Sequence, residues 1–432
     1  MAPEGLPARL ASVMPESTRD RAHPPFPAAD FALPEPTAAA RDEVVASPFG
    51  VYVHVPFCVT RCGYCDFNTY TVGELGSAAS PASYLDSVEI ELARGAEWLA
   101  ERGQLRAAQT VFVGGGTPSL LGAAGLGRIA AAVRSSFGLA PGAEVTTESN
   151  PESTSPEFFA GLLEAGYTRV SLGMQSVSER VLGVLERRHT PGRPMQAAGE
   201  ARAAGFRHVN LDLIYGTPFE TDDDVRASVA VVLDAGVDHV SAYSLIVERG
   251  TAMYRKVSRG ELPAPDEDTL ARRYEIIDAA LVDAGFSWYE VSNWARPGGE
   301  CRHNEIYWVD GNWWGAGPGA HSHLADARFF NVKHPARYSQ AIAGGGLAIG
   351  GGEILTSADR HTEKVMLGLR MVRGIPTEWL GSGAGDVLDH YAGRGLLVVD
   401  EAAGRVRLTG AGRLLADGIV TDLLIAEDSA HP

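Results

Sequence analysis

Cysteine and positive charge are both scarce in this sequence. Of 432 residues only 4 are cysteines, and 37 Lys and Arg stand against 54 Asp and Glu, for a formal net charge of −17. That charge has the wrong sign for general binding to a phosphate backbone, so we expect no nucleic acid partner. No stretch approaches the roughly 18 apolar residues that a membrane-spanning helix needs. The first residues also lack the basic start and apolar segment of a secretory signal, which predicts a cytoplasmic protein with reduced cysteines.

The chain divides by texture into four parts. Residues 1–47 are rich in Pro and Ala without periodicity, which predicts a flexible extension. Residues 48–265 alternate strand and helix patterns. Residues 266–345 continue with a long helical pattern, one strand in "FSWYEVSNWA" and an aromatic, Gly-rich region. Residues 346–432 end in a strand, turn, strand and capped helix, which predicts a small winged-helix-like module.

Six segments of the second part predict strands, each followed by a helical pattern. They are "GVYVHVP", "TVFVGGG", "EVTTESN", "TRVSLGMQS", "RHVNLDLIYG" and "DHVSAYSL". This rhythm is typical of an α/β fold with a parallel sheet, either closed or doubly wound.

The strands themselves alternate between apolar and polar residues. Val51, Val53 and Val55, for example, oppose Tyr52 and His54. A doubly wound sheet is covered on both faces and favours nearly continuous apolar strands, so the alternation argues against it. We predict a partial (β/α)6 barrel whose apolar face meets the helices and whose polar face lines a lumen. A half-covered sheet with its polar face in solvent is the alternative.

Three of the four cysteines, Cys58, Cys62 and Cys65, fall within "FCVTRCGYCDFNTY", just after the first strand. Zinc sites usually show two pairs of ligands, and iron–sulfur clusters usually have four thiolates. A thioredoxin-type Cys-x-x-Cys needs no third cysteine. The pattern favours a [4Fe–4S] cluster with three protein thiolates and one iron open to a small molecule. Chance clustering of structural cysteines is the alternative.

The spacing C-x-x-x-C-x-x-C after the first strand resembles the radical S-adenosylmethionine (SAM) superfamily, in which the methionine end of SAM occupies the open iron. "VFVGGGTPSLL" supports the resemblance, because its glycines follow the second strand where that family binds the SAM amino group. A Rossmann motif fails at Ser119, and no G-x-x-x-x-G-K predicts a phosphate loop. A purely structural turn remains the alternative for these glycines.

Further polar residues lie at or near the ends of the predicted strands. A buried carboxylate needs a partner, so each acid among them holds either a ligand or an internal salt bridge. As a set they resemble the SAM-contacting residues of the oxygen-independent coproporphyrinogen III oxidase group. The resemblance implies that SAM is bound by Tyr52, Tyr64, Gly115, Gly116, Thr117, Glu148, Gln175, Arg187 and Asp212.

Two differences distinguish this chain from the oxidases of that group. The oxidases carry a fourth cysteine two residues after the third, where this chain has Phe67. "HNEIYW", residues 303–308, is similar to the HN-x-x-YW motif of the HemW-type heme chaperones, which bind heme and pass it to apo-hemoproteins. The resemblance therefore implies a heme chaperone without coproporphyrinogen dehydrogenase activity. The alternative is oxidative decarboxylation of coproporphyrinogen III, and a structural iron–sulfur protein without SAM is a third reading.

An aromatic-rich segment suggests a place for heme. Five of the seven tryptophans fall between residues 288 and 314, a concentration suited to stacking a macrocycle, although aromatic clusters also build cores. His303 is our candidate ligand for heme iron, with Cys301 or His321 as a second ligand. His54 more simply organises the cysteine loop.

The expected cofactors are a [4Fe–4S] cluster, SAM and heme. The expected partners are heme and apo-hemoprotein acceptors, with an electron donor if SAM is cleaved. The sequence leaves open a homodimer and a peripheral membrane association through a partner.

Overall fold

The computed structural model describes residues 31–75, 79–188 and 190–429, and its centre is one twelve-stranded sheet. The strands run in the order β14-β13-β12-β11-β1-β4-β5-β6-β7-β8-β10-β9. Neighbours from β11 to β8 pair in parallel. These parallel strands are β1 (Phe49–Val55), β4 (Ala108–Gly115), β5 (Leu139–Ser149), β6 (Arg169–Gln175), β7 (His208–Tyr215), β8 (His239–Ser244) and β11 (Asn312–Ala316).

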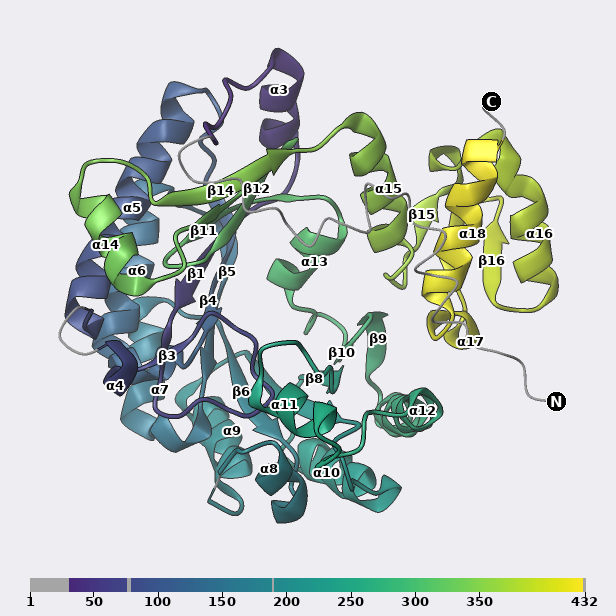
Figure 1. Cartoon of the computed structure of the whole chain (residues 1–432), viewed down its shortest axis with the longest axis horizontal. Coiled ribbons are helices and arrows are strands. Elements are labelled where there is room, and N and C mark those ends of the chain that lie inside the picture. The colour runs from purple at the N-terminus through teal and green to yellow at the C-terminus, as the bar shows by residue number, and fades with distance from the viewer. Residues whose placement is uncertain (1–30, 76–78, 189, 430–432) are drawn as a thin grey trace.

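Antiparallel strands extend both edges of this parallel region. On one side lie β10 (Asn293–Ala295) and β9 (Ser287–Glu290), and on the other β12 (His321–Leu324), β13 (Ala327–Asn331) and β14 (Ile349–Ile354). The edge strands β14 and β9 do not pair with each other within the described ranges, so the barrel is partial. Helix α13 (Arg302–Trp308) stands at the open side of the curved sheet (Figure 1).

Helices cover the outside of the sheet, and most of them pack beside at least one other (Figure 1). They are α5 (Pro81–Glu101), α6 (Gly122–Ser136), α7 (Pro156–Ala165), α8 (Glu179–Val184), α9 (Arg193–Ala204), α10 (Asp222–Asp234), α12 (Glu267–Asp283) and α14 (Pro335–Ala343). Several begin with the side-chain cap that their sequence predicts. Ser80 and Thr221, for example, form capping boxes at the starts of α5 and α10.

The alternation of the strands has the predicted outcome. Val51, Val53 and Val55 are fully buried in the core beneath the helices, while Tyr52 lines an interior cavity. The same holds in β7, where Asn210 and Asp212 face that cavity. The partial barrel is confirmed, and the half-covered sheet with its polar face in solvent is wrong.

Two features of the sheet differ from the prediction. β11 pairs in parallel with β1 and adds a strand beyond the six predicted. "FSWYEVSNWA" forms two antiparallel strands, β9 and β10, rather than one. Both differences concern strands of five residues or fewer, which carry little local periodicity.

The predicted flexible extension lies partly outside the described residues. Within the described part, α3 (Ala38–Ala46) begins at the Thr37 cap and buries Val44 completely in the main core. Glu43 of this helix forms an ion pair with Arg360. The expectation of a flexible segment is therefore wrong for these residues, because an apolar face and an ion pair attach the helix to the rest of the protein.

The C-terminal part has a hydrophobic core of its own. A three-stranded sheet of β15 (Ile375–Pro376), β17 (Arg405–Leu408) and β16 (Leu397–Asp400) packs with α15 (Ser357–Gly368), α16 (Gly385–Gly393) and α18 (Ala416–Ser429), and α17 (Gly410–Arg413) follows β17. The strand, turn, strand and helix are those predicted. The winged-helix description and the domain boundaries stay predictions, and β14 in the large sheet lies beyond the predicted boundary at residue 345.

Candidate functional site

The cysteine loop leaves the sheet after β1 and is closed by a short pair of strands. β2 (Phe57–Cys58) pairs in parallel with β3 (Tyr70–Thr71), just before α4 (Val72–Leu75). Cys58 is buried, and Cys62 and Cys65 are partly exposed. All three thiols line one cavity of about 1540 Å³, so the structure brings the predicted cluster ligands together.

His54 organises this loop from the strand below it. Its Nε2 lies 2.9 Å from the carbonyl oxygen of Asn68, and its Nδ1 lies 2.9 Å from the hydroxyl of Tyr52. Because a carbonyl can only accept, Nε2 donates and Nδ1 accepts from Tyr52. Burial lowers the pKa of His54, which keeps the ring neutral. The structural role expected for His54 is confirmed.

Burial and hydrogen bonds act on the thiols of the loop in opposite directions. Burial raises the pKa of Cys58, and it raises the pKa of Cys65 to about 11, so these thiols are protonated until a metal replaces the proton. Thr117 Oγ1 donates to Cys58 Sγ at 3.7 Å, and Arg187 Nη1 donates to Cys62 Sγ at 3.8 Å. Among the described residues, no group of three or more His, Cys, Asp and Glu is placed to hold a single metal ion.

The glycines after β4 bring the backbone against the cysteine loop. Gly116 N–H donates to Val55 O at 2.8 Å and Thr117 N–H to Phe57 O at 2.7 Å. A Cβ on Gly116 would lie 2.5 Å from Phe57 O, and Gly115 has a φ of +110°. Only glycine fits such an approach. Since Gly115, Gly116 and Thr117 also line the cavity, this segment is more than a connecting turn.

Two carboxylates face the cavity from neighbouring parts of the sheet. Glu148 Oε2 accepts from Gly115 N–H at 2.9 Å, and Asp212 accepts from the Asn210 amide at 2.6 Å and the Ser171 hydroxyl at 3.2 Å. Burial, followed by repulsion from Asp212, raises the pKa of Glu148 to about 8. Burial also raises the pKa of Asp212 to about 6. A cation or hydroxyl donor arriving here would find acceptors already in place.

Gln175 lines the same cavity and has a strained backbone conformation. Its φ is +66°, at an irregularity in the pairing of β6 with β7, and its buried Oε1 has no hydrogen-bond partner within the described structure. Such strain and an unsatisfied buried acceptor are typical of ligand sites. Arg187 Nη2 donates to Gly173 O at 3.0 Å, which fixes the guanidinium near the thiols.

The cavity is lined by all twelve residues predicted for the cluster and for SAM. An orphaned buried acceptor, two carboxyl groups and three thiols in one cavity fit a cluster with SAM beside it. Their individual roles stay predictions.

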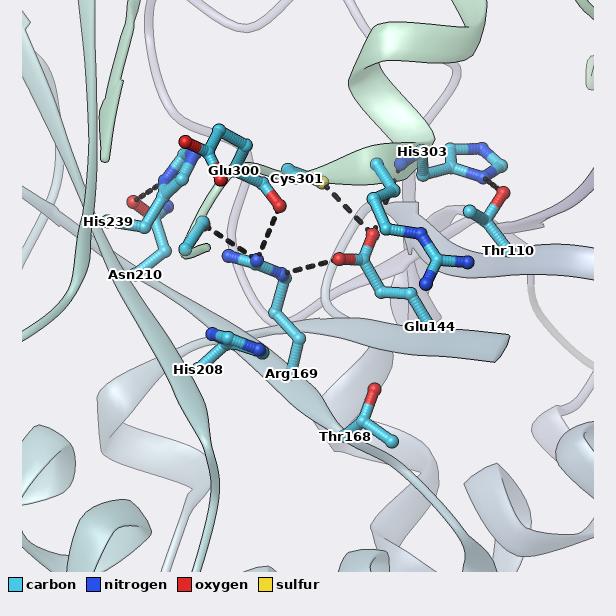
Figure 2. A network of polar contacts seen from close by, with 12 residues as sticks. Thr110, Glu144, Thr168, Arg169, His208, Asn210, His239, Glu300, Cys301 and His303 are labelled. Atoms are coloured by element: carbon cyan, nitrogen blue, oxygen red, sulfur yellow. Dashed lines mark hydrogen bonds and ion pairs between the residues drawn. The ribbon is translucent and has the colours of Figure 1, made fainter. Parts of the chain in front are cut away.

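The floor of the cavity is a buried polar network (Figure 2). Arg169 Nε binds Glu144 at 3.1 Å, and its Nη2 donates to the carbonyls of Gly299 and Glu300 at 2.7 and 2.8 Å. Glu144 in turn accepts from the backbone N–H of His303 at 3.1 Å and from the thiol of Cys301 at 3.6 Å. No sequence motif pointed to Arg169 or Glu144, since their partners lie far along the chain.

His303 is held by this floor rather than presented to a ligand. Its Nδ1 lies 2.7 Å from Thr110 Oγ1, its Nε2 lies 2.9 Å from the Tyr307 hydroxyl, and burial lowers its pKa to about 3. Binding iron would require the loss of one of these bonds, so the geometry favours a structural role. Cys301 is likewise buried against Glu144, and His321 is an exposed residue of β12 that lines a second cavity.

The tryptophans of the predicted heme region do not form one surface. Trp294 and Trp314 are fully buried in the core outside the barrel. Trp313 lies on the inner side with Tyr307 and lines a second cavity. The prediction that these rings together stack a macrocycle is wrong, because neighbouring residues of a strand point to opposite faces.

Comparisons with known proteins agree with this site. The model of the radical SAM superfamily matches residues 52–232. The heme chaperone HemW of Mycobacterium tuberculosis is 57% identical over 377 residues, covering 87% of this chain and 95% of the relative. HemW of Bacillus subtilis is 32% identical over 379 residues, covering 85% and 97%. The solved coproporphyrinogen III oxidase (HemN) of Escherichia coli superposes with a TM-score of 0.75 at 24% identity, over 91% of this chain and 92% of that one, which shows a shared fold. No helix in the described ranges is long and apolar enough to cross a membrane.

Proposed function

Since the chain belongs to the radical SAM superfamily and, within it, to the HemW family, we propose that it is a heme chaperone that binds heme and transfers it to apo-hemoproteins. As a member of this superfamily it holds a [4Fe–4S] cluster and SAM. The coproporphyrinogen oxidase, at 24% identity, shares its fold.

The observation that carries the choice of chaperone over oxidase is Phe67. This residue lies where the oxidases have a fourth cysteine, and its side chain is 58% exposed at the edge of the cavity. A phenyl group can bind neither iron nor a proton, so the chain lacks that thiol. The 57% identity to a named heme chaperone supports the same choice.

Different residues of the cavity hold the cluster and SAM. Cys58, Cys62 and Cys65 hold the cluster, whose reduced form supplies an electron for SAM chemistry when both are bound. Gly115 and Gly116 let the backbone after β4 pack against His54 and the start of the cysteine loop, which holds this segment beside the thiols. Further along the wall, Glu148, Asp212 and Gln175 offer acceptors to the amino and hydroxyl groups of SAM, and Tyr52, Tyr64, Thr117 and Arg187 complete the wall.

Heme titration of the anaerobically reconstituted protein tests this function. We expect a Soret absorption band that saturates with heme, followed by transfer of the heme to an apo-cytochrome. Absence of that band in protein with a fully loaded cluster would refute the chaperone. Carbon dioxide release and protoporphyrinogen formation from coproporphyrinogen, given SAM and an electron donor, would instead establish the oxidase. Calorimetric failure to bind SAM would point to a purely structural cluster.

The further proposed partners are an electron donor, a second copy of the chain and a membrane-associated protein. An electron donor is required only if SAM is cleaved. A homodimer and a peripheral membrane association through a partner stay open, and analytical ultracentrifugation with and without the cluster tests the former.

A further inference from the structure

A second cavity, of about 1000 Å³, adjoins the first at the cysteine loop. Cys62, Cys65, Gly115 and Glu148 line both cavities, so only the loop and the strand ends separate them. The rest of the second cavity is lined by residues that were not assigned to SAM above. They come from the start of α11 (Ala252–Ser258), from β11 and from β12.

Both outer walls of this second cavity are fixed to the cysteine loop. On one side the N–H of Met253 in α11 donates to Gly63 O at 2.8 Å. On the other side the Asn68 amide donates to Pro318 O at 3.0 Å and to Lys333 O at 2.8 Å. The cavity is therefore part of the fold and not a gap between independent loops.

Aromatic side chains form one wall of the cavity. The Trp313 indole stacks on His323 with ring centroids 5.1 Å apart, and Tyr307 meets it edge-on at 4.7 Å. The indole Nε1 of Trp313 also donates to His321 O at 2.8 Å, so the indole is held on several sides. Phe67 and Tyr70 line the same space from the cysteine loop. Rigid, partly exposed rings of this kind suit a flat apolar ligand.

The rim of the cavity is basic in a chain of net charge −17. Four exposed cations line it, namely Arg61, Arg249, Arg255 and Lys333. The carboxylates that line the cavity are Asp66, Glu148 and Glu186, of which Glu186 is paired with Lys256 at 2.5 Å; Glu74, outside the lining, pairs with Arg61 at 3.8 Å. No carboxylate lies within ion-pair distance of Arg249 or Lys333 among the described residues. This local surplus of positive charge favours an anionic ligand.

We propose that this second cavity is the heme site of the protein, with the porphyrin ring against Trp313 and Phe67 and its two carboxylates at Arg249 and Arg255. The inference rests on the proposed function, which names heme as the cargo. A space of about 1000 Å³ matches the size of sites for small molecules and cofactors. An acidic electron-donor protein would also seek a basic rim, but it could not enter the aromatic interior. Arginine is the residue that pairs best with carboxylates, because its planar fork donates two parallel hydrogen bonds.

Heme titration of paired charge-reversal variants tests the site. In cluster-loaded protein, the Arg249→Glu/Arg255→Glu variant should bind ferric heme at least tenfold more weakly than the wild type while its affinity for SAM is unchanged. The matched control is Arg226→Glu/Arg259→Glu, which changes the net charge equally at exposed arginines that line neither cavity. It should bind heme within twofold of the wild type.

Heme dimethyl ester, whose carboxylates are blocked, isolates the contact itself. Blocking the carboxylates should weaken binding to the wild type about tenfold but should not weaken binding to Arg249→Glu/Arg255→Glu, where the carboxylates meet repelling Glu side chains in place of Arg. Equal heme affinities for the wild type and both variants would overturn the site and leave the chaperone function standing. No heme binding by the wild type would refute the function itself. If Arg249→Glu/Arg255→Glu loses only the reduction of its cluster by an acidic donor protein, then the basic rim binds that donor and the heme site is overturned.

Discussion

The ion pair between Arg169 and Glu144 at the floor of the barrel leads to a quantitative prediction. The two side chains are only 2% and 6% exposed, and the pair is enclosed by strands β5 and β6 and by the segment that precedes α13 (Figure 2). Replacing Arg169 with Met keeps most of the apolar stem but removes the guanidinium. Glu144 would then be a buried carboxylate without its cation, and the carbonyls of Gly299 and Glu300 would lose their donor.

The magnitude follows from the burial of both partners. Removing one member of a buried ion pair costs about 3–5 kcal/mol, because the remaining charge is left without compensation. Arg169→Met should therefore lower the free energy of unfolding by about 3–5 kcal/mol. Arg259→Met is the control, since that side chain is 61% exposed and its loss should change stability by no more than about 0.5 kcal/mol.

Urea denaturation monitored by circular dichroism measures this difference. Adding Glu144→Gln to Arg169→Met should recover part of the loss, because the uncompensated charge is then removed. A loss below about 1 kcal/mol for Arg169→Met, or no recovery in the double variant, would show that water or a neighbouring group already satisfies Glu144.

Three further predictions concern single sites. Burial raises the pKa of Glu91 to about 7, so the folded protein keeps a proton that the unfolded chain releases above pH about 4.5. The free energy of unfolding should therefore fall by about 3 kcal/mol as the pH rises from 4.5 to 7, and urea titrations of Glu91→Gln should lack this pH dependence. Gly116→Ala should abolish SAM binding in calorimetry with the far-ultraviolet circular dichroism unchanged, whereas Gly199→Ala, where an added Cβ meets no atom within 4 Å, should bind SAM normally. Cys62→Ser should lose the visible absorption of the reconstituted cluster but stay folded, while Cys301→Ser should keep the cluster; global unfolding of Cys62→Ser would contradict this account.

The main architecture could be predicted because it follows from the short-range alternation of apolar and polar residues in the sequence. The period-two alternation of Val51, Val53 and Val55 determined both the sheet and which face meets the helices. The SAM residues were implied by the resemblance to a known family, and the structure brings them to one cavity because parallel strands end at the same edge of a barrel. β11 could not be predicted, since its five residues follow α13 after a three-residue connection and pair with β1, more than 250 residues earlier.

The heme region shows where sequence reasoning fails. His303 looks like a ligand in its motif, but its partners Thr110 and Glu144 come from strands far away in the chain. Trp313 and Trp314 are adjacent in one strand, so they cannot stack on one ring, and this much could have been argued from the sequence. Concentration of aromatics along a chain is therefore weaker evidence for a cofactor than their alternation within a strand.

The mouth of the larger cavity bears on the choice between enzyme and carrier. Large apolar side chains that are usually buried are exposed there, and they come from separate segments: Val59, Phe67, Ile246 and Val291. A single exposed apolar residue needs no explanation, whereas several around one opening are typical of a surface that another molecule covers. A site that generates reactive species must exclude water at the moment of reaction, which an open apolar rim does not do by itself. A protein that hands an apolar cargo to a partner, by contrast, needs an opening that the partner can cover. Phe67 belongs to this rim as well as to the second cavity, so the residue that replaces a fourth thiol also adds apolar surface where cargo and acceptor would meet.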